Sequence, residues 1–223
     1  MIKDNLLRVR KEIPGDVKLV VVSKFRSVEN IMEAYAAGQR IFGENRPQEM
    51  AAKYGELPDD IEWHMIGHLQ TNKVRLIVPF VSMIQSVDSL RLAQAISSEA
   101  TRIGRVTDVL LEVYIAAEES KFGWLTRELE EALKAGDFYS LSGIRIRGLM
   151  GMATFTGDAG QISREFGGLH EFYLRVKEFY LPEMDTLSMG MSDDYAIAIE
   201  NGSSMVRIGS EIFGPRADGD LGQ

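Results

Sequence analysis

The amino-acid sequence predicts an α/β protein, a single (β/α)8 barrel of the TIM type with an extra N-terminal helix. Short runs rich in Val, Ile and Leu alternate with stretches of helical period, which is typical of parallel strand–helix units. Eight such apolar runs can be counted along the chain. The length of 223 residues lies slightly below the ~250 residues typical of such a barrel.

The first strand–helix unit is the most clearly marked. The run 18–23 is too apolar for a half-exposed strand, and Ser27 is a suitable N-cap for a helix that reaches Ala37. Gly38 supplies the stop signal after that helix. Further strands are expected near 41–42, 62–66, 82–85, 106–115, 146–150, 185–187 and 204–208, and further helices over 47–54, 71–77, 89–102, 125–135, 161–180 and 193–200.

The two ends of the chain complement each other. Only about 15 residues follow the eighth strand, too few for a full helix and its loop. The amphipathic stretch 2–12 is therefore expected to cover the gap as an added helix. No linker or repeat divides the chain, so we expect one domain over residues 1–223. An open doubly wound sheet remains the alternative, because strand order cannot be read from one sequence.

Composition excludes several classes of function. The chain is 45% hydrophobic with a net charge of −8, which disfavours general nucleic-acid binding. It contains no cysteine, so disulfides, thiolate metal sites and a cysteine nucleophile are excluded. No apolar run approaches the ~20 residues of a membrane span. We expect a cytoplasmic monomer that binds neither membranes nor nucleic acid.

Lys24 directly follows the most apolar strand, at the end where barrels of this type carry their reactive groups. Desolvation there lowers the pKa of an amine and makes it nucleophilic toward a carbonyl. Lys24 is thus a candidate for Schiff-base formation. The alternative is that Lys24 extends its charge to the rim of the barrel and has no chemical role.

Two turns near the C-terminus are suited to a phosphate group. The loops after strands seven and eight form the phosphate site in many such barrels. They contain Ser188 and Gly190 in one turn, and Gly209 and Ser210 in the other. Small residues, hydroxyl groups and backbone N–H groups together can hold a phosphate dianion, although two ordinary serine-capped turns would look the same.

Arg207 stands between Val206 and Ile208 in a strand expected to be buried. A buried guanidinium is costly unless it is paired or functional. It either forms an ion pair, with Glu44 or Asp185 as partner, or donates a hydrogen bond to a ligand nitrogen.

Two further positions are candidates for lining the barrel mouth. His64 and His68 lie at the end of strand three, but their spacing on a strand and turn makes a poor metal site, so we predict no metal and assign His68 to the lining. Asn45 either points at a ligand or caps the helix that begins near Pro47.

Together these motifs resemble the pyridoxal phosphate homeostasis protein family, in order from about Lys18 to Gly214. The matching segments are 22–24, 42–45, 64–73, 119–123, 148–152, 187–192 and 207–214. The resemblance implies the barrel of the alanine racemase N-terminal domain, with pyridoxal 5′-phosphate (PLP) bound to Lys24 as a Schiff base. It implies further that Ser188, Gly209 and Ser210 hold the phosphate, that Arg207 faces the pyridine nitrogen, and that Asn45 and Met150 lie against the cofactor.

The same resemblance implies a role in PLP homeostasis without catalytic turnover, with PLP-dependent apoenzymes as partners. A cationic Arg207 would keep the pyridine nitrogen unprotonated, which weakens the cofactor as an electron sink. The chain also has no second, β-rich domain of the kind from which related racemases draw a second base. A PLP-dependent racemase or lyase of low activity, and a phosphosugar-type enzyme with a substrate imine on Lys24, remain alternatives. Tyr114 and Phe25 depart from the family pattern, which usually has Asn and Thr there.

Overall fold

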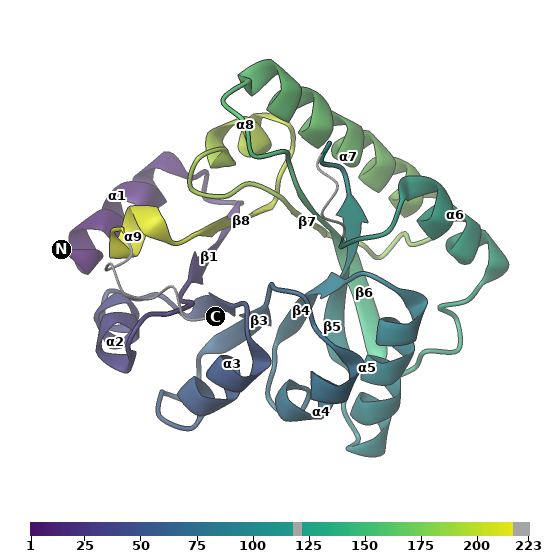
Figure 1. Cartoon of the computed structure of the whole chain (residues 1–223), viewed down its shortest axis with the longest axis horizontal. Coiled ribbons are helices and arrows are strands. Elements are labelled where there is room, and N and C mark those ends of the chain that lie inside the picture. Colours follow the sequence, from purple (N-terminus) through teal and green to yellow (C-terminus); the bar gives the residue numbers. More distant parts are fainter. Residues whose placement is uncertain (118–121, 216–223) are drawn as a thin grey trace.

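The computed structural model describes residues 1–117 and 122–215. Its eight strands are all parallel and form a closed barrel in sequence order, with the last strand paired to the first. The predicted (β/α)8 barrel is therefore confirmed, and the open-sheet alternative is wrong (Figure 1). The strands are β1 (Lys18–Val22), β2 (Ile41–Glu44), β3 (Glu62–Met65), β4 (Met83–Val87), β5 (Thr107–Tyr114), β6 (Ile144–Met152), β7 (Thr186–Ser188) and β8 (Met205–Ile208).

Helices surround the barrel on its outside (Figure 1). The first crossover follows the predicted signals, because the Ser27 side chain accepts a hydrogen bond from the N–H of Asn30 and Gly38 has a φ of 90°. The helices are α1 (Ile2–Glu12), α2 (Val28–Ala36), α3 (Pro47–Tyr54), α4 (Val74–Ile77), α5 (Leu90–Arg102), α6 (Thr126–Ala135), α7 (Ala159–Phe179), α8 (Tyr195–Glu200) and α9 (Ser210–Phe213), with a 3-10 turn η1 (Thr71–Lys73) before α4.

The N-terminal helix fills the place expected for it. In Figure 1, α1 lies beside the short α9 that follows β8, and the two helices are in contact. Leu6 and Val9 of α1 are fully buried. The Asn5 side chain donates to the carbonyl oxygen of Ile212 over 3.0 Å, and Arg8 pairs with Glu211. The prediction that α1 covers the gap after β8 is confirmed.

Some element boundaries differ from the prediction. β6 begins at Ile144 and continues to Met152, because it pairs along the whole length of β5. α7 begins at Ala159, since the Asp158 side chain accepts hydrogen bonds from the N–H groups of Gly160 and Gln161. The predicted helix 71–77 divides into η1 and α4.

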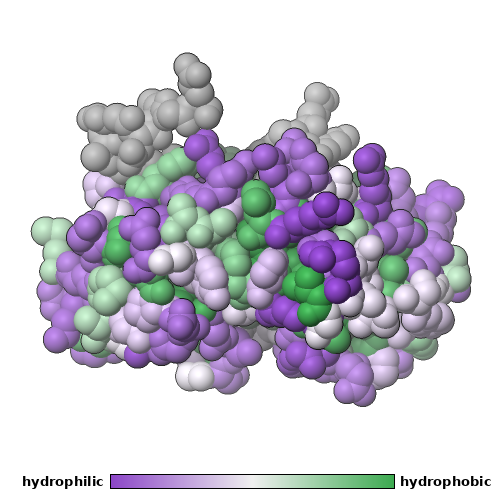
Figure 2. All heavy atoms as spheres, turned by 90° about the horizontal axis from the view of Figure 1, so that it is seen from below, coloured by the Kyte–Doolittle hydropathy of each residue, from purple (hydrophilic) through white to green (hydrophobic). Residues whose placement is uncertain are grey.

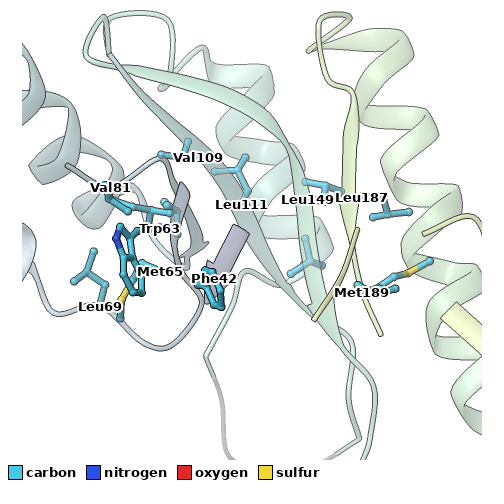
Figure 3. Packing of buried hydrophobic residues seen from close by; sticks show 14 of the residues in the cluster. Phe42, Trp63, Met65, Leu69, Val81, Val109, Leu111, Leu149, Leu187 and Met189 are labelled. Atoms are coloured by element: carbon cyan, nitrogen blue, oxygen red, sulfur yellow. The ribbon is translucent and has the colours of Figure 1, made fainter. Parts of the chain in front are cut away.

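The apolar core has two parts. The larger lies between strands and helices, and Figure 3 shows Phe42, Trp63 and Met65 grouped within it. The Phe42 and Trp63 rings are 6.2 Å apart between centroids. Burial of each such side chain stabilises the fold by ~1.5–3 kcal/mol. The smaller part consists of Val20, Met83, Leu110, Met150 and Met205.

The outer surface is mostly hydrophilic in the view of Figure 2, where apolar residues appear in scattered places. Across the part of the chain that the structure describes, no helix has both the length and the hydropathy to span a bilayer.

Candidate ligand site at the carboxyl end of the barrel

A cavity of about 230 Å³ lies at the carboxyl end of the strands, where ligand sites of such barrels are found. It brings together Lys24 from the loop after β1, Arg207 from β8, and Gly209 and Ser210 from the turn after β8. Lys24 lies more than 180 positions from the other three along the chain, and all four were predicted as site residues. The rest of the lining consists of Val22, Arg26, Phe155, Met191, Ser192 and Asp193.

Arg207 is only 3% exposed, and burial lowers its pKa to about 10. It therefore remains a cation at neutral pH. Its Nη1 donates to the Ser188 hydroxyl over 2.6 Å and its Nη2 to the Gly151 carbonyl over 3.1 Å. The predicted ion-pair alternative is wrong, because Glu44 pairs with Lys53 and Asp185 with Arg147.

A chain of hydrogen bonds continues from Arg207 into the barrel interior. The Ser188 hydroxyl donates to Gln85 Oε1 over 2.7 Å, and Gln85 Nε2 lies 2.9 Å from His64 Nδ1. Burial lowers the pKa of His64 to about 3, so its ring is neutral and Nδ1 can accept from the Gln85 amide. This hydrogen-bonded chain is made of uncharged groups and orients the Arg207 guanidinium.

Ser188 is fully buried, and its hydroxyl is engaged by Arg207 and Gln85 rather than lining the cavity. Ser192, four residues later, does line the cavity, and its Oγ accepts from the Gly209 N–H over 3.4 Å. Ser192 belongs to the turn predicted from the sequence as a phosphate site, but it was not itself predicted as a site residue. The strand register of β7 would have revealed the difference, since Ser188 ends the strand and points inward.

Two glycines permit the close approach of these turns. Gly190 has a φ of 96°, and a Cβ atom there would lie 2.6 Å from the Ala198 side chain. Gly209 passes so near β1 that its Cβ would lie 3.0 Å from the Val22 carbonyl oxygen. Larger residues would separate the turns that border the cavity.

A second cavity of about 290 Å³ adjoins the first, and the two share Phe155 and Met191. Its lining is mostly apolar and includes Tyr114, one of the two positions that depart from the family pattern. Glu112 is its acidic member, 3% exposed, and burial raises its pKa to about 7. Glu112 was not predicted from the sequence, because β5 is almost continuously buried and shows no alternation; it follows Leu110 by two positions, and Leu110 belongs to the cluster inside the barrel.

The other predicted residues lie around this centre. His68 is hydrogen-bonded to Asp88 over 3.0 Å and stacks at 4.1 Å on Phe122, a residue that lines the second cavity. Met150 is buried inside the barrel with Val20.

Asn45 is half-buried at the end of β2. It does not cap α3, because the N-cap position is occupied by Arg46, and that alternative is wrong. Its backbone lies close to Gly67, where a Cβ atom would be 2.5 Å from the Asn45 carbonyl oxygen.

Within residues 1–117 and 122–215, no group of three or more potential metal ligands of the His, Asp or Glu type is found. The segment 119–123, which carries part of the resemblance, falls largely outside the described residues.

Comparison with known proteins places this barrel in a family. The family model described as alanine racemase, N-terminal domain, matches residues 1–217. The pyridoxal phosphate homeostasis protein of Vibrio alginolyticus is 39% identical, covering 91% of this chain and 88% of that protein. PipY of Synechococcus elongatus, solved with PLP bound, has a TM-score of 0.88 at 36% identity and covers 96% of this chain and 100% of its own. Alanine racemase from Clostridium difficile shares the fold, with a TM-score of 0.74 at 18% identity, over 98% of this chain and 57% of that one. The chain therefore belongs to the alanine racemase N-terminal domain family, and within it to the pyridoxal phosphate homeostasis proteins.

Proposed function

We propose that this protein binds PLP as a Schiff base on Lys24 and serves PLP homeostasis as a carrier without catalytic turnover. The observation that carries the proposal is the meeting of Lys24, Arg207 and the Gly209–Ser210 turn in one cavity. The amine can form an imine with an aldehyde, and the fixed guanidinium can donate a hydrogen bond to a pyridine nitrogen. The turn of small residues can hold a phosphate through its backbone N–H groups. The names of the relatives support the same function.

The size of the cavity favours a small ligand such as a single-ring phosphorylated aldehyde. Its volume of about 230 Å³ lies below the ~300–1,000 Å³ range of ligand pockets. We assign the phosphate to Gly209, Ser210 and Ser192, and the pyridine nitrogen to Arg207. Ser188 then acts as the partner that fixes Arg207. Asn45, Met150 and His68 are assigned to the surroundings of the ring and the mouth.

Arg207 is also the reason why turnover is not expected. PLP supplies a ring that can withdraw electrons from a bound amine, and a protonated pyridine nitrogen strengthens that effect. Arg207 is a donor and remains charged, since its pKa of about 10 lies well above neutral pH. A guanidinium has no acceptor, so Arg207 cannot accept a hydrogen bond from a protonated pyridine nitrogen as a carboxylate would. It instead donates to the nitrogen and thereby favours the neutral form.

A second candidate function is that of a PLP-dependent racemase or lyase of low activity. The observation that favours it is Glu112, whose pKa of about 7 suits a general acid or base beside the cavity. An exchange experiment separates the two functions. The carrier proposal predicts no α-proton exchange of added amino acids in deuterated water, together with transfer of PLP from this protein to a PLP-dependent apoenzyme. Rapid exchange that is lost in Glu112→Gln would establish the enzyme instead. We propose further that the carrier is a single-domain cytoplasmic monomer.

A further inference from the structure

A cluster of charged side chains lies behind the loop that carries Lys24. It consists of Glu44 at the end of β2 and of Glu49 and Lys53 on α3, and we call it the α3 ion cluster. Glu44 is fully buried, and the Lys53 side chain is only 9% exposed. None of the three was singled out by the sequence as part of the site, and none lines the cavity.

Lys53 uses its ammonium group completely. Nζ donates to Glu44 Oε1 over 2.8 Å, to Glu49 Oε1 over 2.7 Å and to the backbone carbonyl of Ser23 over 2.8 Å. An ammonium group has three donors, so all three are satisfied. The third bond fixes the peptide that immediately precedes Lys24.

Glu49 holds the other side of Lys24. Its Oε1 accepts a hydrogen bond from the backbone N–H of Phe25 over 2.7 Å. Phe25 has a φ of 61°, and among the described residues it alone, apart from glycines, has a positive φ. Bulky residues rarely adopt this left-handed conformation, so the surroundings must enforce it. The carboxylate of Glu49 supplies one such constraint.

The α3 ion cluster thus grips the backbone on both sides of a single residue. Ser23 is further fixed by its hydroxyl, which donates to Glu44 Oε1 over 2.6 Å, and by its N–H, which donates to the Gly43 carbonyl. Lys24 lies between the Ser23 carbonyl, which accepts a hydrogen bond from Lys53, and the Phe25 N–H, which donates one to Glu49. Its side chain leaves the loop toward the cavity that Arg207 and Ser210 also line.

Stability alone is a poor reason for such a cluster. Burying the Glu44 carboxylate and the Lys53 ammonium costs desolvation free energy that their attraction does not always return, and apolar side chains of similar size often stabilise as well. Glu44 Oε2, moreover, has no hydrogen-bond partner among the described residues. A cluster that is costly to bury and attached to two consecutive peptides is better suited to fixing geometry.

We propose that Glu49 and Lys53 are positioning residues, which hold the strained turn at Phe25 and thereby aim the Lys24 amine into the cavity. The inference rests on the proposed function of Lys24. It adds a specific cause for the orientation of that lysine, and this cause is the α3 ion cluster, whose Glu49 and Lys53 lie on a helix outside the barrel.

Glu49 is the residue to change, because it is partly exposed and its loss leaves the buried Lys53–Glu44 pair intact. Glu49→Gln keeps an oxygen that can accept from the Phe25 N–H, whereas Glu49→Leu removes every acceptor. Glu130→Leu serves as the matched control, since Glu130 forms the same i,i+4 pair with Lys134 on the distant α6. Three quantities are measured for each variant: amide exchange at Phe25, the acetylation rate of Lys24 without cofactor, and the rate of Schiff-base formation with PLP.

In Glu49→Leu we expect faster exchange at Phe25 and altered acetylation of Lys24. Schiff-base formation should slow by roughly ten- to a hundredfold, the effect of a small misplacement of a reacting group. Glu49→Gln should restore most of each quantity, and Glu130→Leu should match the unmodified protein. Schiff-base formation and acetylation at normal rates in Glu49→Leu would overturn the inference, even with faster amide exchange. An unmodified protein that forms no Schiff base would instead overturn the proposed function, and Lys24 acetylation would then still decide whether the α3 ion cluster positions the amine.

Discussion

The two central groups of the site are held in opposite ways. Lys24 is fixed from outside the barrel by the α3 ion cluster, which grips the backbone around it. Arg207 is fixed from inside by Ser188, Gln85 and His64, which are uncharged and hold its side chain. The comparison teaches that a side chain on a loop can be oriented only if the backbone of the loop is itself constrained. A guanidinium on a strand already has a fixed backbone and needs only its side chain oriented.

The largest effect on the free energy of unfolding should come from a substitution in the α3 ion cluster. Lys53→Met removes the cation and leaves Glu44 buried without a counter-ion, which costs about 3–5 kcal/mol. Urea unfolding measures this loss. The control is Lys134→Met, an exposed i,i+4 partner of Glu130, for which a change below about 1 kcal/mol is expected. If both variants lose equally little, Glu44 does not depend on Lys53 as its counter-ion in the folded protein.

The stability of the folded protein should depend on pH through Glu112, which interacts electrostatically with Arg207. Burial raises the pKa of Glu112 in the folded protein to about 7, above the 4.5 of a free glutamate side chain. Because the folded-state pKa is the higher one, the favourable contribution is complete below pH 4.5 and is lost as the pH rises to 7. Glu112→Gln should therefore be more stable than the unmodified protein at pH 8, by up to about 3 kcal/mol, and equal to it near pH 4.5.

Unfolding by urea at the two pH values, without cofactor, tests the Glu112 prediction. A stability difference that is the same at both values would show that Glu112 titrates normally in the folded protein.

The smallest expected effects are on ligand affinity, and they distinguish the role of Ser210 from that of Ser188. Ser210→Ala deletes a donor to the proposed phosphate, worth ~1.5–3 kcal/mol, so PLP affinity should fall while pyridoxal affinity stays unchanged. Ser188→Ala acts through Arg207 and should weaken both compounds alike. Equilibrium dialysis of PLP and pyridoxal against each variant provides the measurement. Selective loss of PLP binding in Ser188→Ala would place the phosphate near Ser188 instead.

Much of the fold followed from local patterns. Apolar runs with helical stretches between them predicted the strands and helices, although the strand order and the closure of the barrel could not be read from them, and the amphipathic pattern of residues 2–12 predicted α1. Lys24 and Arg207 stood out because a charge at the end of an apolar strand, or within one, requires an explanation.

The supports around these two residues could not be predicted in the same way. Lys53 reads as an ordinary helix residue, and its burial depends on how α3 packs against the turns after β1 and β2. Gln85 and Ser188 are separated by 103 positions and meet only across the closed barrel. Ser188 and Ser192 are chemically identical, and only the strand end distinguishes the inward residue from the one lining the cavity.

The central claim is tested most directly by borohydride reduction of the unmodified protein loaded with PLP, followed by mass mapping of the modified lysine. A visible chromophore that disappears on reduction, with the pyridoxyl group on Lys24, is the predicted result. Lys24→Ala should show neither chromophore nor label while keeping its far-ultraviolet circular dichroism, because Lys24 lies in a loop outside the packed core. A chromophore that persists in Lys24→Ala, or a label found on Lys73 or Lys121 of the unmodified protein in place of Lys24, would contradict the account.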